Sequence, residues 1–168
     1  VSDAAAQTAG WGVMSAMTPY DRLAKLGLTL PKAMPAQANY LPFLLRGSQL
    51  HISGQGPFDA DGQLRIGKVG RDRNVEQAYD DARLTGLNLL AQVQAAIGDL
   101  GRVAHVIKVL AMVNATDDFK DHPKVINGCS DLFVAVFGDA GGHTRSAVGM
   151  GSLPMGISVE IEASFEIA

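Results

Sequence analysis

ISVEIEASFEI, residues 157–167, is the most regular stretch of the chain and sets its fold class. Apolar side chains stand at alternate positions from Ile157 to Ile167, and a serine or a glutamate stands at each position between them. This period of two predicts a β-strand with one face in the core and a polar opposite face. We therefore expect a sheet near the C-terminus that buries one of its faces.

A long helix and a central strand precede this stretch. Asn74 and Gln77 have the spacing of a capping box, apolar side chains then repeat with helical period as far as Ile97, and Gly98 ends the pattern. Residues 103–114 are rich in Val, Ile and Leu at both alternating sets of positions, which is typical of a strand covered on both sides.

A second long helix and two shorter elements complete the pattern. Asp121 and Pro123 open a helix whose apolar side chains, from Val125 to Phe137, form one continuous face. Near the N-terminus, Thr18 caps a short helix that stops at Gly27. Two strands at 41–45 and 49–53 flank an Arg-Gly-Ser turn and predict a hairpin, while Asp59–Gly62 predicts a plain turn and not a calcium loop.

This order of strands, helix, strand, helix and strands predicts the α+β class, with two helices packed on one face of a sheet. The chain of 168 residues, 47% apolar and 18% charged, is long enough for one sizeable core. We expect a single domain over residues 17–168. Residues 1–16, rich in Ala and Gly and without the pattern of a secretion signal, are an N-terminal extension of unassigned role.

Charge, hydropathy and cysteine content exclude several classes of function. The formal charge is -3 and basic residues do not cluster, so neither a nucleic acid nor a membrane surface is an expected partner. Apolar runs are too short for a membrane span. The single cysteine, Cys129, permits no internal disulfide and no cysteine-based metal site. A cytoplasmic location is the resulting expectation.

Arg145 and the last strand offer the best chemistry in the chain. If residues 145–150 pair antiparallel with the last strand, Arg145 lies opposite Glu162 and Ala147 opposite Glu160, on one face. A guanidinium binds a carboxylate through two parallel hydrogen bonds, and a glutamate can activate water. The pattern indicates hydrolysis of a small carboxylate, although spacing alone favours an ordinary cross-strand ion pair between Arg145 and Glu162. The glycine-rich run 138–142 fits close approach to a ligand or a flexible connection equally well.

Other candidate motifs give weaker indications of a functional site. The glycines around residues 54–56 and 149–151 lack the spacing of a nucleotide fingerprint, and no P-loop lysine is present. The four histidines are scattered without metal-ligand spacing, so we expect no metal site and place them in the core or on the surface. Cys129 falls on the apolar helix face, where a thiol usually fills space.

The C-terminal residues resemble a known family. Arg145-Ser146-Ala147-Val148, Leu153-Pro154 and Val159-Glu160-Ile161-Glu162-Ala163 are similar to the signature of the YjgF/RidA family of reactive intermediate deaminases, also called endoribonuclease L-PSP. The resemblance covers roughly residues 40–168 and includes Ser53-Gly54-Gln55, the helix after Asn74, the strand from Val103, and Asn127 with Phe133.

This resemblance implies a chorismate-mutase-like α+β subunit in a homotrimer, with clefts between subunits. It implies cofactor-free hydrolysis of 2-imino acids to 2-keto acids and ammonia. Matched position by position, Arg145 pairs with the substrate carboxylate and Glu160 orients the attacking water. Four further positions match substrate-binding residues of the family: Tyr40, Gly54, Asn127 and Ala147.

Two other functions stay open beside the deaminase. The N-terminal extension, the longer glycine-rich approach to Arg145 and the small residues at 149–152 resemble a divergent branch, and a fold alone does not fix an activity. The alternative is a regulatory trimer that binds small 2-keto or other carboxylates without turnover. Endoribonuclease activity is also attached to the family, but the acidic charge balance argues against it.

Overall fold

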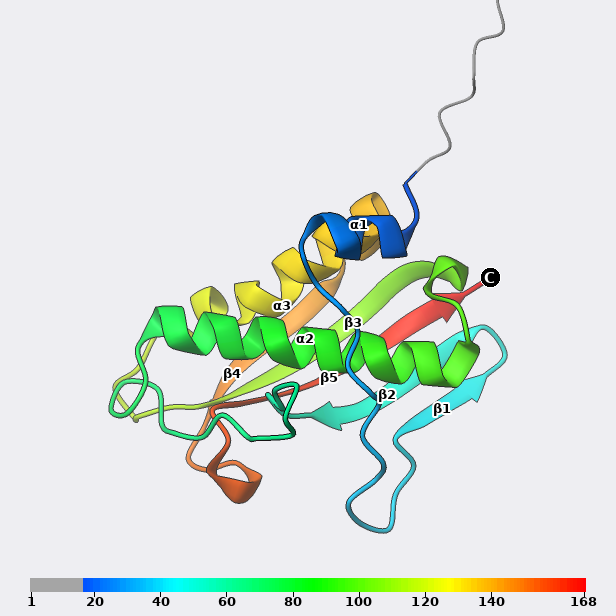
Figure 1. Cartoon of the computed structure of the whole chain (residues 1–168). Coiled ribbons are helices and arrows are strands. Elements are labelled where there is room, and N and C mark those ends of the chain that lie inside the picture. Colours follow the sequence, from blue (N-terminus) through cyan, green and yellow to red (C-terminus); the bar gives the residue numbers. More distant parts are fainter. Residues whose placement is uncertain (1–16) are drawn as a thin grey trace, which may run out of the picture.

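The computed structural model describes residues 17–168, and the extension predicted at 1–16 lies outside the described residues. Five strands form one sheet in the order β1-β2-β5-β3-β4, in which only β3 and β4 are parallel (Figure 1). The elements are α1 (Pro19–Lys25), β1 (Phe43–Arg46), β2 (Gln49–Gln55), α2 (Val75–Ile97), β3 (Val103–Asn114), α3 (His122–Phe137), β4 (Thr144–Met150) and β5 (Val159–Ile167), with short 3-10 turns at Leu100–Arg102, Gly138–Gly141 and Pro154–Gly156.

Helices α2 and α3 lie side by side on one face of the sheet, and α1 packs beside α3 (Figure 1). The other face of the sheet has no helix over it within residues 17–168 (Figure 1). This arrangement confirms the predicted α+β class with two helices on one face. None of the helices in this described part is long and apolar enough to cross a membrane.

The predicted helix ends are confirmed. The Asn74 side chain accepts a hydrogen bond from the Gln77 backbone N–H, the Gln77 side chain returns one to Asn74, and Gly98 closes α2 in the left-handed conformation. Thr18 caps α1 in the same way. The third helix begins at His122, and Asp121 makes no side-chain cap bond there.

The core lies between the helices and the sheet. Phe133 of α3 and Phe165 of β5 meet edge to face with ring centroids 5.8 Å apart, and both are fully buried. Gly128 lets α3 approach α2 closely, since a Cβ at this position would collide with the backbone of Tyr79. Cys129 is buried in this layer, which raises the pKa of its thiol well above the usual range and confirms a space-filling role.

The predicted pairing of residues 145–150 with the last strand is wrong. β4 pairs parallel with β3, so β3 separates it from β5, and Arg145 lies beside Val109, which lies beside Ala163. The segment between β4 and β5 does not form a tight turn: Ser158 N–H donates to Arg65 O, and Gly67 N–H donates to Gly156 O. These bonds hold the segment between β4 and β5 against the loop before α2. As a result β5 begins at Val159 and not at Ile157.

This register puts the predicted site residues on opposite faces of the sheet. Arg145 and Ala147 align with the buried, helix-facing residues Val109 and Ala111. Glu160 and Glu162 alternate with the buried side chains of β5 and point to the open face. Arg145 therefore makes no cross-strand ion pair with Glu162. The glycine-rich run is a 3-10 turn packed on α3, where a Cβ at Gly141 would meet the Phe133 carbonyl.

Candidate functional site

Glu160 lies in a pocket of about 480 Å³. The pocket is formed by the segment before β1, the end of β2 with the loop that follows it, and the stretch from Pro154 into β5. Tyr40 and Gly54, both predicted as binding residues, line it together with Glu160. The remaining lining residues are Met34, Pro35, Gln37, Ala38, Pro42, Ser53, Gln55, Gly56, Phe58, Pro154, Met155 and Ile157.

The Glu160 carboxylate rests directly on the backbone of Gly54. A Cβ at position 54 would collide with Glu160 Oε1, so any residue other than glycine would displace the carboxylate. The pairing of β2 with β5 shifts register between Ile52 and Gln55, and this β-bulge brings the Gly54 backbone up to the carboxylate. Glycine at position 54 therefore permits the observed position of the candidate catalytic carboxylate.

Burial raises the pKa of Glu160, and the neighbouring Glu162 carboxylate adds to this effect. Both shifts disfavour the charged form of the side chain, because the charge loses water and faces a like charge. A carboxyl group whose pKa lies closer to neutrality accepts a proton more readily, which suits a general base.

Two side-chain hydrogen bonds fix the pocket walls. Gln92 of α2 is almost fully buried, and its Nε2 donates to the Met34 carbonyl at 2.6 Å. Ser53 Oγ donates to the Leu41 carbonyl at 2.6 Å. These two bonds hold the segment before β1 against the helix layer and the end of β2.

A buried ionic cluster supports the start of β5. Asp81 of α2 is fully buried, accepts a hydrogen bond from Arg73 at 2.7 Å and pairs with Arg65 at 3.4 Å. Ser158 Oγ donates to the same carboxylate at 2.6 Å. Because Ser158 lies two residues before Glu160, this cluster positions the strand that carries the glutamate.

Arg145 is held by α3, away from the Glu160 pocket. Its guanidinium donates to Ser130 Oγ at 2.9 Å and to the Pro123 carbonyl at 3.3 Å. Asn127 stands on the same helix face, between these two contacts, and is exposed. Ala147 follows two residues along β4, on the same face as Arg145, and packs against the core. The predicted residues Arg145, Asn127 and Ala147 thus form a second group.

Sequence reasoning missed the partners of Arg145. Ser130 Oγ lies 2.9 Å from His143 Nε2, and His143 Nδ1 lies 2.7 Å from the Gly141 carbonyl. The tautomer with hydrogen on Nδ1 satisfies every bond in this chain, from Arg145 through Ser130 and His143 to Gly141. Ser130 follows Asn127 by three residues on the helix and His143 precedes Arg145 by two on the chain, spacings that could have indicated the cluster.

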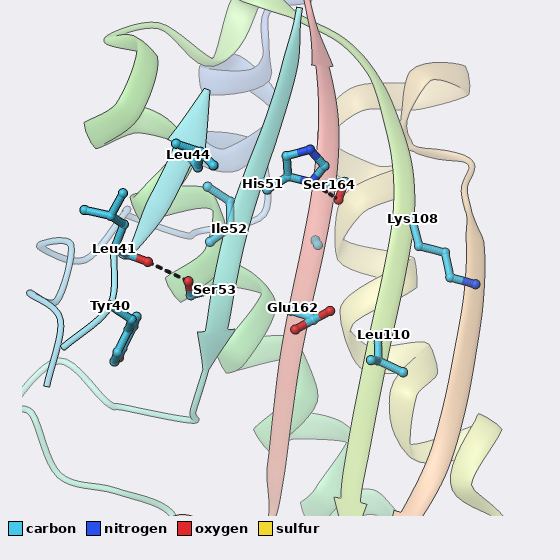
Figure 2. Close-up of a pocket in the computed structure, with 11 residues that line it drawn as sticks. Tyr40, Leu41, Leu44, His51, Ile52, Ser53, Lys108, Leu110, Glu162 and Ser164 are labelled. Carbon is cyan, nitrogen blue, oxygen red and sulfur yellow. Dashed lines mark hydrogen bonds between the residues drawn. The ribbon is translucent and has the colours of Figure 1, made fainter. Parts of the chain in front are cut away.

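A second hollow, of about 410 Å³, lies on the open face of the sheet next to the Glu160 pocket. Figure 2 shows Glu162 from β5, Lys108 from β3 and His51 from β2 around it, with Tyr40 at its edge. His51 Nδ1 and Ser164 Oγ lie 2.9 Å apart. Tyr40 lines both hollows, so its ring forms part of the wall between them.

The described residues, 17–168, contain no cluster of three His, Cys, Asp or Glu side chains able to hold a metal ion.

The predicted turn at Asp59 is confirmed, because its carboxylate accepts hydrogen bonds from the backbone of Asp61 and Gln63.

Known proteins are similar to this chain in sequence and in fold. Protein TCP17 of Trypanosoma cruzi is 40% identical over 146 residues, which are 86% of this chain and 91% of that protein. The crystal structure of Atu1372 from Agrobacterium tumefaciens, a protein of unknown function, is 45% identical with a TM-score of 0.84, over 89% of this chain and 92% of its own.

A more distant structure contains a ligand. The structure of E. coli TdcF with bound serine has 26% identity and a TM-score of 0.61, over 82% of this chain and 94% of that one. A family described as "YjgF/chorismate_mutase-like, putative endoribonuclease" matches residues 20–160. On this match, together with the fold and the relatives above, the chain belongs to the YjgF/chorismate mutase-like family.

Proposed function

We propose that the protein hydrolyses 2-imino acids to 2-keto acids and ammonia, at clefts between the subunits of a homotrimer. The observation that carries this proposal is the Glu160 carboxylate, half-buried in its pocket against the Gly54 backbone and with a raised pKa. A carboxylate in this state is suited to take a proton from a water molecule beside a bound substrate.

Arg145 supplies the second element of the proposed site. Ser130 and Pro123 each accept a hydrogen bond from one of its terminal nitrogens and fix the orientation of the guanidinium. A guanidinium has five N–H donors, so donors remain for the carboxylate of a substrate. The family member TdcF holds serine, which supports recognition of a small α-carboxylate by proteins of this fold.

The separation of the two groups supports a site shared between copies of the chain. Within one chain, Arg145 faces α3 on the edge strand β4, whereas Glu160 lies in a pocket beyond β3 and on the other side of the sheet. Neither group can reach the other through the buried core. A neighbouring subunit that placed its β4 edge near the Glu160 pocket would complete the pair.

The reaction needs only these groups. Arg145 would hold the substrate carboxylate, and Glu160 would accept a proton from water as the water oxygen bonds to the imine carbon. Glu160 would then pass this proton to the nitrogen, giving a carbinolamine. A second proton, from the new hydroxyl group, would follow the same route to the nitrogen as the carbon–nitrogen bond breaks, so that ammonia leaves, the carbonyl forms and Glu160 is again deprotonated. Orientation and proton transfer together account for several kcal/mol of barrier lowering.

The proposal is tested with Arg145→Ala and Glu160→Gln beside the parent protein, on freshly generated 2-iminopropanoate. We expect each variant to lose about a hundredfold or more in kcat/KM. Glu166→Gln is the matched control, because Glu166 lies on the same face of the same strand but is exposed and away from the pocket. Light scattering after gel filtration should show trimers for all four proteins. Parental rates in Arg145→Ala, or a monomeric parent, would refute the proposal.

A second candidate is a trimer that binds small carboxylates without turnover. The serine in TdcF favours it, because that protein was captured with an amino acid in place. Titration with 2-ketobutyrate alongside the imine assay separates the two functions. Binding that depends on Arg145, with no acceleration of imine hydrolysis, would select the regulatory function.

A further inference from the structure

The Glu160 pocket is larger and more apolar than the smallest imino acids require. Its volume is about 480 Å³, and Glu160 and Tyr40 are the only titratable side chains among the lining residues. The wall beyond Glu160 consists mainly of Met34, Phe58 and the stretch from Pro154 to Ile157. The methyl group of a bound 2-iminopropanoate would leave most of this wall without a contact.

We propose that this pocket selects 2-imino acids with a large apolar side chain, aliphatic or aromatic, and that Met34 and Met155 contact that side chain. This inference rests on the proposed function, since Glu160 fixes which end of the pocket holds the reacting carbon. The bound side chain would extend away from Glu160 along the apolar wall.

Met34 is a fixed part of the wall. Its carbonyl accepts the 2.6 Å hydrogen bond from Gln92 of α2, a residue that is only 1% exposed. Burying a glutamine is costly unless its amide is hydrogen-bonded. The fold thus uses a buried polar group to hold the backbone of Met34 at the pocket.

Met155 occupies an unfavourable position for a residue with a side chain. Its φ of 56° is left-handed, where a Cβ is disfavoured, and its side chain is 63% exposed at the pocket. A glycine at position 155 would adopt this conformation without strain. Because the Met155 side chain is not buried in the chain, its packing does not offset the strain. Strain of this kind persists mainly at functional sites, and a flexible thioether is well suited to contact apolar ligands of several shapes.

The charge of the pocket excludes acidic side chains. A second carboxylate on the substrate would face Glu160, and within residues 17–168 of the chain no Lys, Arg or His lines the pocket to receive it. In the proposed function, Arg145 of a neighbouring subunit already holds the first carboxylate. Burial, the main cause of the raised pKa of Glu160, also disfavours a second negative charge beside it. A basic side chain would compete with water for the same carboxylate. An apolar side chain avoids both conflicts.

The test compares kcat/KM for imines generated from alanine, leucine, phenylalanine and glutamate. Each buried methylene strengthens binding about fourfold. The parent protein should therefore favour the leucine and phenylalanine imines over the alanine imine by about tenfold or more, and hydrolyse the glutamate imine slowest. A preference for the alanine or glutamate imine would overturn the inference.

Met155→Arg tests the role of the wall directly. We expect the leucine-to-glutamate ratio of kcat/KM to fall by about tenfold or more, because the new cation attracts a side-chain carboxylate and repels apolar groups. Leu26→Arg is the matched control, since Leu26 is an apolar residue at the end of α1, 39% exposed and outside the pocket. An unchanged ratio in Met155→Arg, or an equal change in Leu26→Arg, would contradict the assignment.

Binding measurements separate this inference from the proposed function. The dissociation constants of pyruvate and 4-methyl-2-oxopentanoate, the keto acids of alanine and leucine, are compared by calorimetry. If no imine is hydrolysed but the larger keto acid binds more tightly, the proposed function fails and the apolar pocket stands. If imines are hydrolysed and both keto acids bind equally, the proposed function stands and the apolar pocket fails.

Discussion

The Glu160 pocket and the Arg145 strand are built in different ways. The pocket is formed by irregular segments, which include a β-bulge before Gln55 and Met155 in the left-handed backbone conformation, and it encloses the Glu160 carboxylate. Arg145 stands on a regular edge strand, its guanidinium held by helix α3, and is not part of that pocket. The Glu160 pocket encloses space but has no cationic side chain from residues 17–168 of this chain in its lining, whereas the β4 strand supplies the Arg145 guanidinium. The comparison teaches that one chain keeps the enclosed carboxylate and the guanidinium apart, as the proposed shared site requires.

Mixed trimers offer the sharpest way to break this comparison. Arg145→Ala and Glu160→Gln are produced together with different affinity tags, and trimers that carry both tags are purified. If each cleft takes Arg145 from one subunit and Glu160 from the next, cyclic symmetry leaves one intact cleft of three, and about one third of the parental activity returns. Each variant alone should stay near one hundredth or less of that activity.

The mixed trimers also give a clear negative result. If both groups of a cleft came from the same subunit, every cleft would lack one of them and no activity would return. The control is a trimer of parent and Arg145→Ala chains purified in the same way, which shows that tagging and mixing leave the clefts active.

Gly54→Ala tests the enclosure of the Glu160 half. The new Cβ would collide with Glu160 Oε1 and push the carboxylate away from its position, so we expect kcat/KM to fall about tenfold or more. Gly151→Ala is the matched control, because a Cβ there meets nothing within 4 Å. The melting temperature and trimer mass are measured for both variants. Equal activity of the two variants would show that the carboxylate position is unimportant.

The sequence predicts the regular elements because their signals are local. The alternating pattern of the last strand, the capping box at Asn74 and Gln77, and Gly98 each depend on side chains a few positions apart. The structure confirms the capping box and Gly98, and it confirms the alternation from Val159 to Ile167. Pairing between distant strands leaves no such local signal. The position of β4 beside β3 follows from how the segment between β4 and β5 packs on the loop before α2, and the alternating pattern does not record that packing.

The candidate site shows the same division. Residue type points to Arg145, and the resemblance points to Arg145 and Glu160. The spacing of Ser130 and His143 is compatible with a cluster, but only the folded chain shows that they hold Arg145 and that Met155 lines the Glu160 pocket. The strained φ of Met155 is a property of its loop, and an isolated methionine in a sequence gives no sign of it. Residue type shows which chemistry is available, while tertiary packing determines which groups meet.

Glu162→Gln sharpens the electrostatic side of the comparison, with a smaller effect. Glu162 helps to raise the pKa of Glu160, so its neutralisation should lower that pKa. In the proposed mechanism Glu160 is a base, which it can be only when deprotonated, so kcat/KM falls as the pH drops through this pKa. This acid limb of kcat/KM should therefore move to lower pH in the variant. Glu166→Gln, on the same strand face, should leave the limb in place. An acid limb that does not move in Glu162→Gln would assign it to a group other than Glu160.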